Sequence, residues 1–199
     1  EYAIAGGTGI DQTGNFNPAT YGGSDITDPN VFAQAFSGMV TALSSTGAKG
    51  VVTNIPNITD LPHFTTVPHN PVPLDAATAG LVNQGYAPYN GGLQQAFAAL
   101  AGTNLFTQEE LDRRTINFVE GQNAMVVIDE DLTDLGAINP AFAGIPQYRQ
   151  ATEDDLFVLP LSSLIPQGYG TQIPLEDKWV LTPEEQMAIQ TATNAYNAT

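Results

Sequence analysis

The chain has 199 residues, with 21 aspartates and glutamates against five lysines and arginines, which gives a formal charge of −16. Nucleic acids and anionic membrane surfaces are bound by clustered cations, so this charge excludes a nucleic-acid partner and argues against an anionic membrane surface. The chain contains no cysteine, which excludes disulfides, thiolate chemistry and cysteine zinc sites, and no apolar run approaches the roughly 18 residues of a membrane span. The length predicts a single domain over residues 1–199.

Residues 1–28 are rich in glycine, asparagine, threonine and aspartate without a sustained hydrophobic period, which is typical of a long surface loop. The glycines at positions 6, 7 and 9 superficially resemble a phosphate-binding loop. No strand precedes them and no lysine follows, so a flexible loop is the favoured interpretation. The aspartates of this segment lack EF-hand spacing, which leaves calcium binding as the weaker alternative. Because no methionine precedes Glu1, we expect a processed or cleaved product.

Residues 28–55 are predicted to form a helix followed by a strand. Asp28 can cap the helix, Pro29 suits its first turn, and apolar residues then recur three and four positions apart to about residue 45. Gly47 ends the helical pattern. Residues 49–55 are a β-branched run that is apolar on both parities, which is typical of a strand buried on both faces in a parallel sheet.

A proline-rich loop follows over residues 56–75. Ligands in open α/β sheets bind beyond the carboxyl ends of strands, so residues 54–75 are the first place to look for a site. The loop holds both histidines of the chain, His63 and His69. Their spacing in a loop does not match a helical zinc pair, so no metal and no cofactor are predicted. Either histidine could act as a general base only beside a serine and a carboxylate.

Helices are expected next over residues 76–84 and 88–101, followed by a short helix that a capping box of Thr107 and Glu110 opens. The last helix is expected over residues 182–197. Thr182 caps it, Pro183 takes its first position and Glu185 completes a second capping box.

Short strands are expected between these helices. Residues 115–119 and 124–128 are spaced for a hairpin, and residues 155–160 have the composition of a buried strand. The acidic run between them is interpreted as a solvated loop; it comprises Asp129, Glu130, Asp131 and Asp134.

The six serines offer no clear nucleophile, because none lies in a Gly-x-Ser-x-Gly elbow. Ser162 and Ser163 follow a predicted strand and are the best placed of the six. A polar turn remains the favoured interpretation of this pair.

Several blocks of the sequence, in one order, resemble a Bacteroidetes-type branch of the SGNH/GDSL hydrolases. They are ALSSTGAKGVV, VVTNIPNITDLPHFTTVPHNPVPLD, YAPYNGGLQQAF, FVEGQNAMVVIDEDLTD, ATEDDLFVLPLSSLI and LEDKWVLTPEE. The resemblance implies an α/β fold, a flavodoxin-like three-layer α/β/α sandwich with a mainly parallel sheet, of which this chain would be the C-terminal portion. It also implies ester hydrolysis of the esterase or lipase type by a serine nucleophile.

The family's catalytic motifs are largely absent from this chain. The family carries its serine in an N-terminal GDS motif, takes oxyanion donors from a glycine and an asparagine of later motifs, and ends with an Asp-x-x-His motif. No GDS motif occurs here. By this resemblance Asp177 occupies the aspartate position and Val180 the histidine position, and valine cannot transfer a proton.

The resemblance implies a partner, a substrate class and a location. The partner would be the N-terminal segment of the same fold, missing or on a separate chain, and the substrate a small ester or lipid. The location would be secreted or at the cell envelope, including an outer-membrane-associated lipoprotein. A non-catalytic secreted or cell-surface binding module on the same scaffold is the alternative, and a carbohydrate-binding or carbohydrate-processing protein is the third hypothesis.

Overall fold

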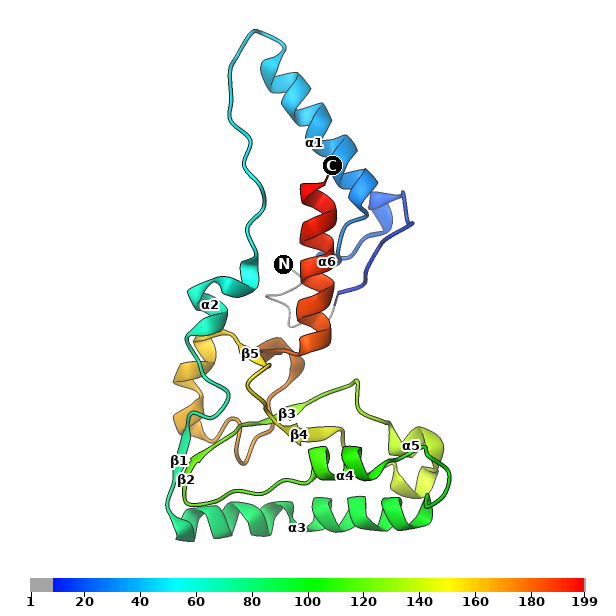
Figure 1. The fold of residues 1–199 in the computed structure, drawn as a ribbon, viewed down its shortest axis with the longest axis vertical. Helices are drawn as coiled ribbons and strands as arrows, with labels where there is room; N and C mark the ends of the chain where they lie inside the picture. Colours follow the sequence, from blue (N-terminus) through cyan, green and yellow to red (C-terminus); the bar gives the residue numbers. More distant parts are fainter. Residues whose placement is uncertain (1–8, 199) are drawn as a thin grey trace.

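A computed structural model describes residues 9–198 as an elongated molecule of mixed helices and short strands (Figure 1). The helices are α1 (Pro29–Ser44), α2 (Pro62–Thr65), α3 (Ala76–Ala99), α4 (Gln108–Arg114), α5 (Leu135–Ile138) and α6 (Pro183–Asn197). The strands are β1 (Val72–Leu74), β2 (Gly121–Asn123), β3 (Val126–Ile128), β4 (Tyr148–Gln150), β5 (Leu156–Phe157) and β6 (Val180–Leu181). Short 3-10 turns include η2 (Ile58–Asp60), η4 (Leu159–Ser163) and η6 (Asp177–Trp179). The predicted α/β composition is confirmed at this level.

The six strands pair as three separate two-stranded antiparallel ladders, β1 with β2, β3 with β4 and β5 with β6. Parallel pairing among the described residues is limited to isolated bridges, such as that between Val127 and Leu175. Residues 9–198 therefore contain no parallel sheet and no three-layer sandwich. The prediction of a 115–128 hairpin was wrong, because β2 and β3 each pair with a strand from a distant part of the chain.

The predicted strand over residues 49–55 is also absent. The segment is extended but has no neighbouring strand, and Val51 is 91% and Val52 63% exposed. A β-branched run favours an extended backbone, but a strand also needs a partner for its backbone hydrogen bonds. The described part of the chain supplies no such partner at this position.

The core lies in residues 57–198, which we call the body. One cluster of buried apolar side chains joins β3, β5, β6, η4 and α6 around Phe157 and Leu161. A second lies between α3 and the segment that carries Ile116 and Phe118. A third joins the end of α3 to α4 and α5 around Leu93. α1 contributes to none of the three and has no buried residue.

α3 is one continuous helix, although the sequence predicts a break at Pro88. Proline removes one intrahelical hydrogen bond, and the packing of α3 outweighs that loss. Two asparagines of α3 also bind the neighbouring extended chain. Asn90 Oδ1 accepts from the N–H of Ile116 at 3.0 Å, and Asn83 Oδ1 accepts from the N–H of Phe118 at 2.8 Å. The strand predicted at residues 115–119 is thus extended chain that pairs with helix side chains instead of with a strand.

The N-caps predicted from local sequence are confirmed, but the predicted capping box of Thr107 and Glu110 is only half formed, because the Glu110 carboxylate bonds to Thr133 and Arg114 instead of to Thr107. Asp28 caps α1, Thr107 caps α4, and Thr182 with Glu185 forms a capping box on α6. These signals involve residues at most three positions apart, so they do not depend on long-range packing. Among the described residues no helix is long and apolar enough to cross a membrane.

Candidate functional site

Three carboxylates from separate parts of the body converge beside the start of α6. Glu130 follows β3, Asp177 opens η6, and Glu185 lies in the first turn of α6. Their carboxylate oxygens lie within 4.8 Å of one another, with Glu130 the most exposed and Glu185 the most buried of the three. We call Glu130, Asp177 and Glu185 the carboxylate cluster.

Backbone pairing brings these three segments together. The N–H of Ile128 donates to the carbonyl of Leu175 at 2.8 Å, and the N–H of Leu175 donates to Val126 at 2.9 Å. These bonds place the residues after β3 beside those that lead into η6. β6 then connects η6 directly to α6, so the first turn of α6 must lie close to both.

Like charges at this spacing favour the protonated form of a carboxyl group. Burial, together with the charge of Glu130, raises the pKa of Asp177 to about 6. Burial also raises the pKa of Glu185 to about 8, against the hydrogen bond donated by the backbone of Thr182. Because the two carboxyls interact, they titrate as a pair. The cluster therefore retains protons near neutral pH.

Within residues 9–198, no cation forms an ion pair with the cluster. Lys178 pairs with Glu176 on the surface, and Arg113 pairs with Asp129 at 2.9 Å. Arg149 binds Asp155 with two hydrogen bonds of 2.6 and 2.7 Å and also contacts Asp129. The donor set of the cluster is therefore oxygen only and acidic. It could hold protons or a hard cation such as Ca²⁺ or Mg²⁺, which prefers such oxygens.

The buried ion pairs correct one part of the sequence interpretation. Asp129 is only 1% exposed and is bound by Arg113 and Arg149, so it does not belong to a solvated loop. Glu130, Asp131 and Asp134 are exposed, as predicted. Sequence patterns do not indicate this pairing, because Arg149 lies on β4, 20 positions along the chain from Asp129.

Asp177, which the family resemblance places in an Asp-x-x-His motif, lies among carboxylates. An aspartate that orients a catalytic histidine must stay ionised beside an imidazole. The raised pKa of Asp177 and the charges of Glu130 and Asp131 act in the opposite direction, and the hydrogen bond with Glu185, which lowers this pKa, does not offset them. Val180 is buried in β6, where it pairs with Phe157 in the first core cluster.

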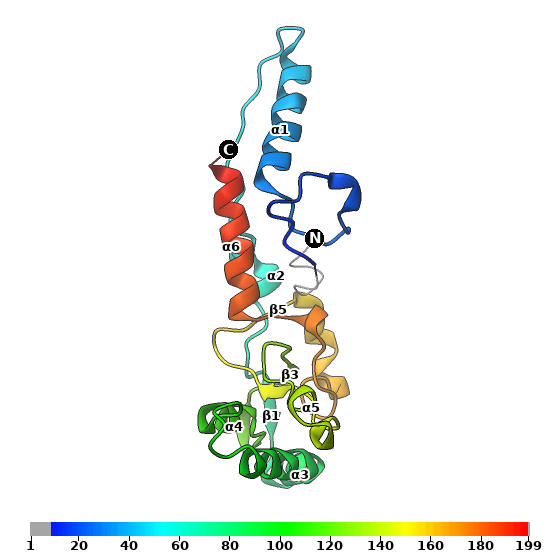
Figure 2. The ribbon, with the colours of Figure 1, turned by 90° about the vertical axis from the view of Figure 1, so that its right-hand side faces the viewer.

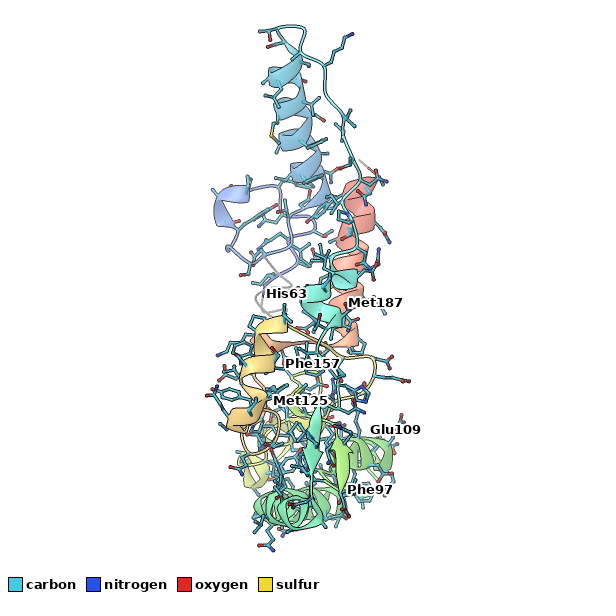
Figure 3. All side chains as sticks on the ribbon, turned by 90° about the vertical axis from the view of Figure 1, so that its left-hand side faces the viewer. His63, Phe97, Glu109, Met125, Phe157 and Met187 are labelled. Carbon is cyan, nitrogen blue, oxygen red and sulfur yellow. The ribbon has the colours of Figure 1, made fainter. Side chains whose placement is uncertain are left out.

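The two histidines lie elsewhere in the body. His63 sits on α2 where this turn meets η4, with its ring edge-on to Phe64 at 4.8 Å between centroids (Figure 3). Its Nε2 is buried and has no hydrogen-bond partner among the described residues. The carbonyl of His69 accepts from the N–H of Met125 at 3.0 Å. Within residues 9–198, no hydrogen bond or ion pair joins either imidazole to a serine or a carboxylate.

The best-placed serines close local turns. The hydroxyl of Ser162 donates to the carbonyl of Leu159 at 2.8 Å, and that of Ser163 donates to Pro160 at 2.9 Å. Both side chains are exposed on η4. The polar-turn interpretation of this pair is therefore confirmed.

The carboxylate cluster was not predicted from the sequence. Its members stand at positions 130, 177 and 185, and only Asp177 was singled out as a site residue, by the family resemblance. The glycines at positions 6 and 7 lie outside the described residues. No protein-family model, curated protein or solved structure matches this chain.

Proposed function

We propose that this chain is part of an SGNH/GDSL-type ester hydrolase and that the nucleophilic serine of the enzyme lies outside these 199 residues. The proposal includes the three-layer α/β/α fold with a mainly parallel sheet, to which this chain would add the C-terminal portion. It also includes a secreted or envelope location, a small ester or lipid as substrate, and an N-terminal segment of the same fold as partner.

One observation supports the proposal that the nucleophilic serine lies outside these 199 residues. A serine nucleophile needs a general base within hydrogen-bond reach and a third group that orients this base. The hydroxyls of Ser162 and Ser163 are directed to backbone carbonyls, as are those of Ser44 and Ser45. No described serine is bonded to a histidine, so these residues alone do not form a triad.

The order of the sequence blocks supports the proposal that this chain is part of an SGNH/GDSL-type ester hydrolase. The proline-rich segment after residue 55, the block around Ile128 and the segment around Asp177 follow one another as in the family. A groove of about 360 Å³ beside α3 gives the body a mainly apolar surface that suits the acyl part of an ester. Tyr86 and Tyr148 are among the side chains that line it.

The test is covalent labelling with a fluorophosphonate probe, together with hydrolysis of short p-nitrophenyl esters. We expect no labelled serine and no hydrolysis with the 199-residue chain. In the natural protein from its source, we expect one labelled serine that maps outside the printed sequence. A labelled Ser162 or Ser163 in folded chain would contradict the proposal.

A non-catalytic binding module is the second candidate, and Val180 favours it. A buried valine in β6 stands where the family resemblance expects the catalytic histidine. If the natural protein neither labels with the probe nor hydrolyses esters, the binding module replaces the hydrolase.

A further inference from the structure

Residues 29–56 project from the body as an arm that consists of α1 and the extended return segment after it (Figures 1 and 2). Every residue of the three core clusters lies outside this arm. Lys49 is the one charged residue between positions 29 and 59, in a chain whose formal charge is −16. The arm is therefore nearly neutral, and the rest of the chain is strongly acidic.

The return segment has the backbone of a strand without any strand beside it. Residues 48–54 are extended, and their backbone groups make no hydrogen bonds within the described part of the chain. Val51 and Val52 are neighbours, so in an extended chain their side chains point to opposite faces. They are 91% and 63% exposed, which means that neither face is covered.

α1 is uncovered as well. None of its 16 residues is buried, and Met39, Val40 and Leu43 are 55%, 39% and 70% exposed. Between α1 and the return segment lies a groove of about 490 Å³, and its lining includes Phe36, Val40 and Val52. Most helical stability in proteins comes from the packing of an apolar face. α1 has no buried face and no charged residue, so it lacks this source of stability.

The base of the arm is nevertheless fixed. The ring of Phe32 stacks on that of Tyr196 of α6 with 4.6 Å between centroids. The side chain of Asn197 binds both backbone groups of Ile55, at 2.8 Å to its N–H and 3.0 Å to its carbonyl. The arm is thus held in position while its outer part stays uncovered.

We propose that this arm docks into an α/β sheet formed by polypeptide outside these 199 residues, with residues 49–54 inserted as an interior strand and α1 on one face of that sheet. The inference rests on the proposed function, which requires such a partner, and it assigns the surface and the mode of contact. Free backbone groups on a β-branched segment are satisfied by strand pairing. Apolar side chains on both of its faces need cover on both faces, as in a parallel sheet with helices on each side.

A second copy of this chain does not meet these needs. Paired return segments of two copies would form a two-stranded ribbon, which leaves one backbone edge of each segment unpaired. Among its described residues, the body of a second copy has only two-stranded ladders of two or three residues, which offer no interior position for a longer strand. Together with the return segment, α1 reaches the roughly 20–30 residues that one partner contributes to a stable interface.

The first test is hydrogen exchange, read by mass spectrometry, on the natural protein as purified from its source. We expect the amides of residues 49–54 to exchange at least about 100-fold more slowly than unprotected amides, because interior strands open rarely. Exchange at the rate of unprotected amides would overturn the proposal. This readout does not depend on activity. Slow exchange without fluorophosphonate labelling would contradict the hydrolase proposal and support the docking proposal. Labelling without slow exchange would support the hydrolase and contradict the docking.

The second test identifies the occupant. The printed chain has no cysteine, so Val51→Cys in the natural protein can carry a benzophenone maleimide for photocrosslinking. Val119→Cys, at a site on the body that is 53% exposed, is the matched control. We expect a crosslink from position 51 to an apolar strand outside these 199 residues, at several times the control yield. A crosslink to residues 49–55 of a second copy, a crosslink to the body of this chain, or no yield above the control would each overturn the proposal.

Discussion

The arm and the body of this molecule differ in how their apolar residues are used. In the body, side chains such as Leu93 and Phe157 are fully buried in clusters that join several elements. In the arm, Leu43 and Val51 are as apolar but lie in the open. The sequence pattern of both regions is that of a core. The difference teaches that the pattern of an amphipathic helix or a β-branched run shows which side chains are suited to burial. Whether those side chains are buried depends on the polypeptide that packs beside them.

The largest expected effect lies in the body, at Arg149. This guanidinium is buried between Asp129 and Asp155, so Arg149→Met leaves Asp155 without a cation in the core and leaves Asp129 with Arg113 alone. We expect a loss of about 3–5 kcal/mol in the free energy of unfolding, measured by urea titration. Arg113→Gln is the control, because the Arg113 side chain is 44% exposed and should cost less than about 1 kcal/mol. Equal losses for both variants would contradict the buried ion network.

The comparison between the regions is sharpened by two leucine truncations. Leu93→Ala should cost about 2–5 kcal/mol, because Leu93 is fully buried where α3 meets α4 and α5. Leu43→Ala in the arm should change the stability of the 199-residue chain by less than about 0.5 kcal/mol, because Leu43 is 70% exposed. In the natural protein, docking of the arm should raise the cost of Leu43→Ala. A large cost in the 199-residue chain alone would mean that the arm packs on its own body.

A smaller effect is expected at the start of α6, the helix that carries Glu185 in its first turn and contacts the base of the arm at its other end. The hydroxyl of Thr182 accepts from the N–H of Glu185 as the N-cap. Thr182→Ala should cost roughly 0.5–2 kcal/mol in thermal or urea unfolding. Thr182→Ser keeps the hydroxyl and should recover most of this loss. If alanine has no effect, α6 does not depend on this cap.

The smallest effect is a pH dependence from the carboxylate cluster. The pKa values of Asp177, about 6, and Glu185, about 8, lie above their ordinary values, so ionisation favours the unfolded chain. The stabilisation is present below about pH 4 and is lost as pH rises through about 6 to 8. Glu185→Gln keeps an oxygen that can accept from Thr182 and removes the charge. After allowance for solvent screening, it should be more stable than wild type by about 1 kcal/mol at pH 8.5 and about equal at pH 5.

Glu153→Gln is the matched control for that pH profile, because Glu153 is exposed and lies outside the cluster. It should leave the profile unchanged. An unchanged profile for Glu185→Gln as well would show that the three carboxylates do not share protons. If millimolar Ca²⁺ removed the stability difference between wild type and Glu185→Gln at pH 8.5, a bound cation instead of protons would offset the repulsion among the three carboxylates.

The sequence allowed correct prediction of the features that depend on a few neighbouring residues. The caps at Asp28, Thr107 and Thr182 are examples, because each cap and its donors lie within one turn. Predictions that needed a distant partner were less successful. The extended chain at Ile116 binds Asn90 of α3, which periodicity does not reveal.

The same limit applies to the candidate site. Asp177 was singled out by resemblance to a motif, whereas Glu130 and Glu185 became its neighbours only through the bonds between β3 and the segment before η6. Residues 49–55 are the reverse case. Their pattern predicts a buried strand, and the described residues offer no strand to pair with it.

Amide hydrogen exchange on the 199-residue chain tests the contrast between arm and body most directly. We predict that residues 48–54 exchange at the rate of unprotected amides, because they make no backbone hydrogen bonds. The amides of β3, which pair with β4 and lie in the core, should exchange slower by about three orders of magnitude or more. Comparable protection of residues 48–54 and β3 would contradict the account. The arm would then be packed within the fold of this chain, and it would not be an uncovered docking surface.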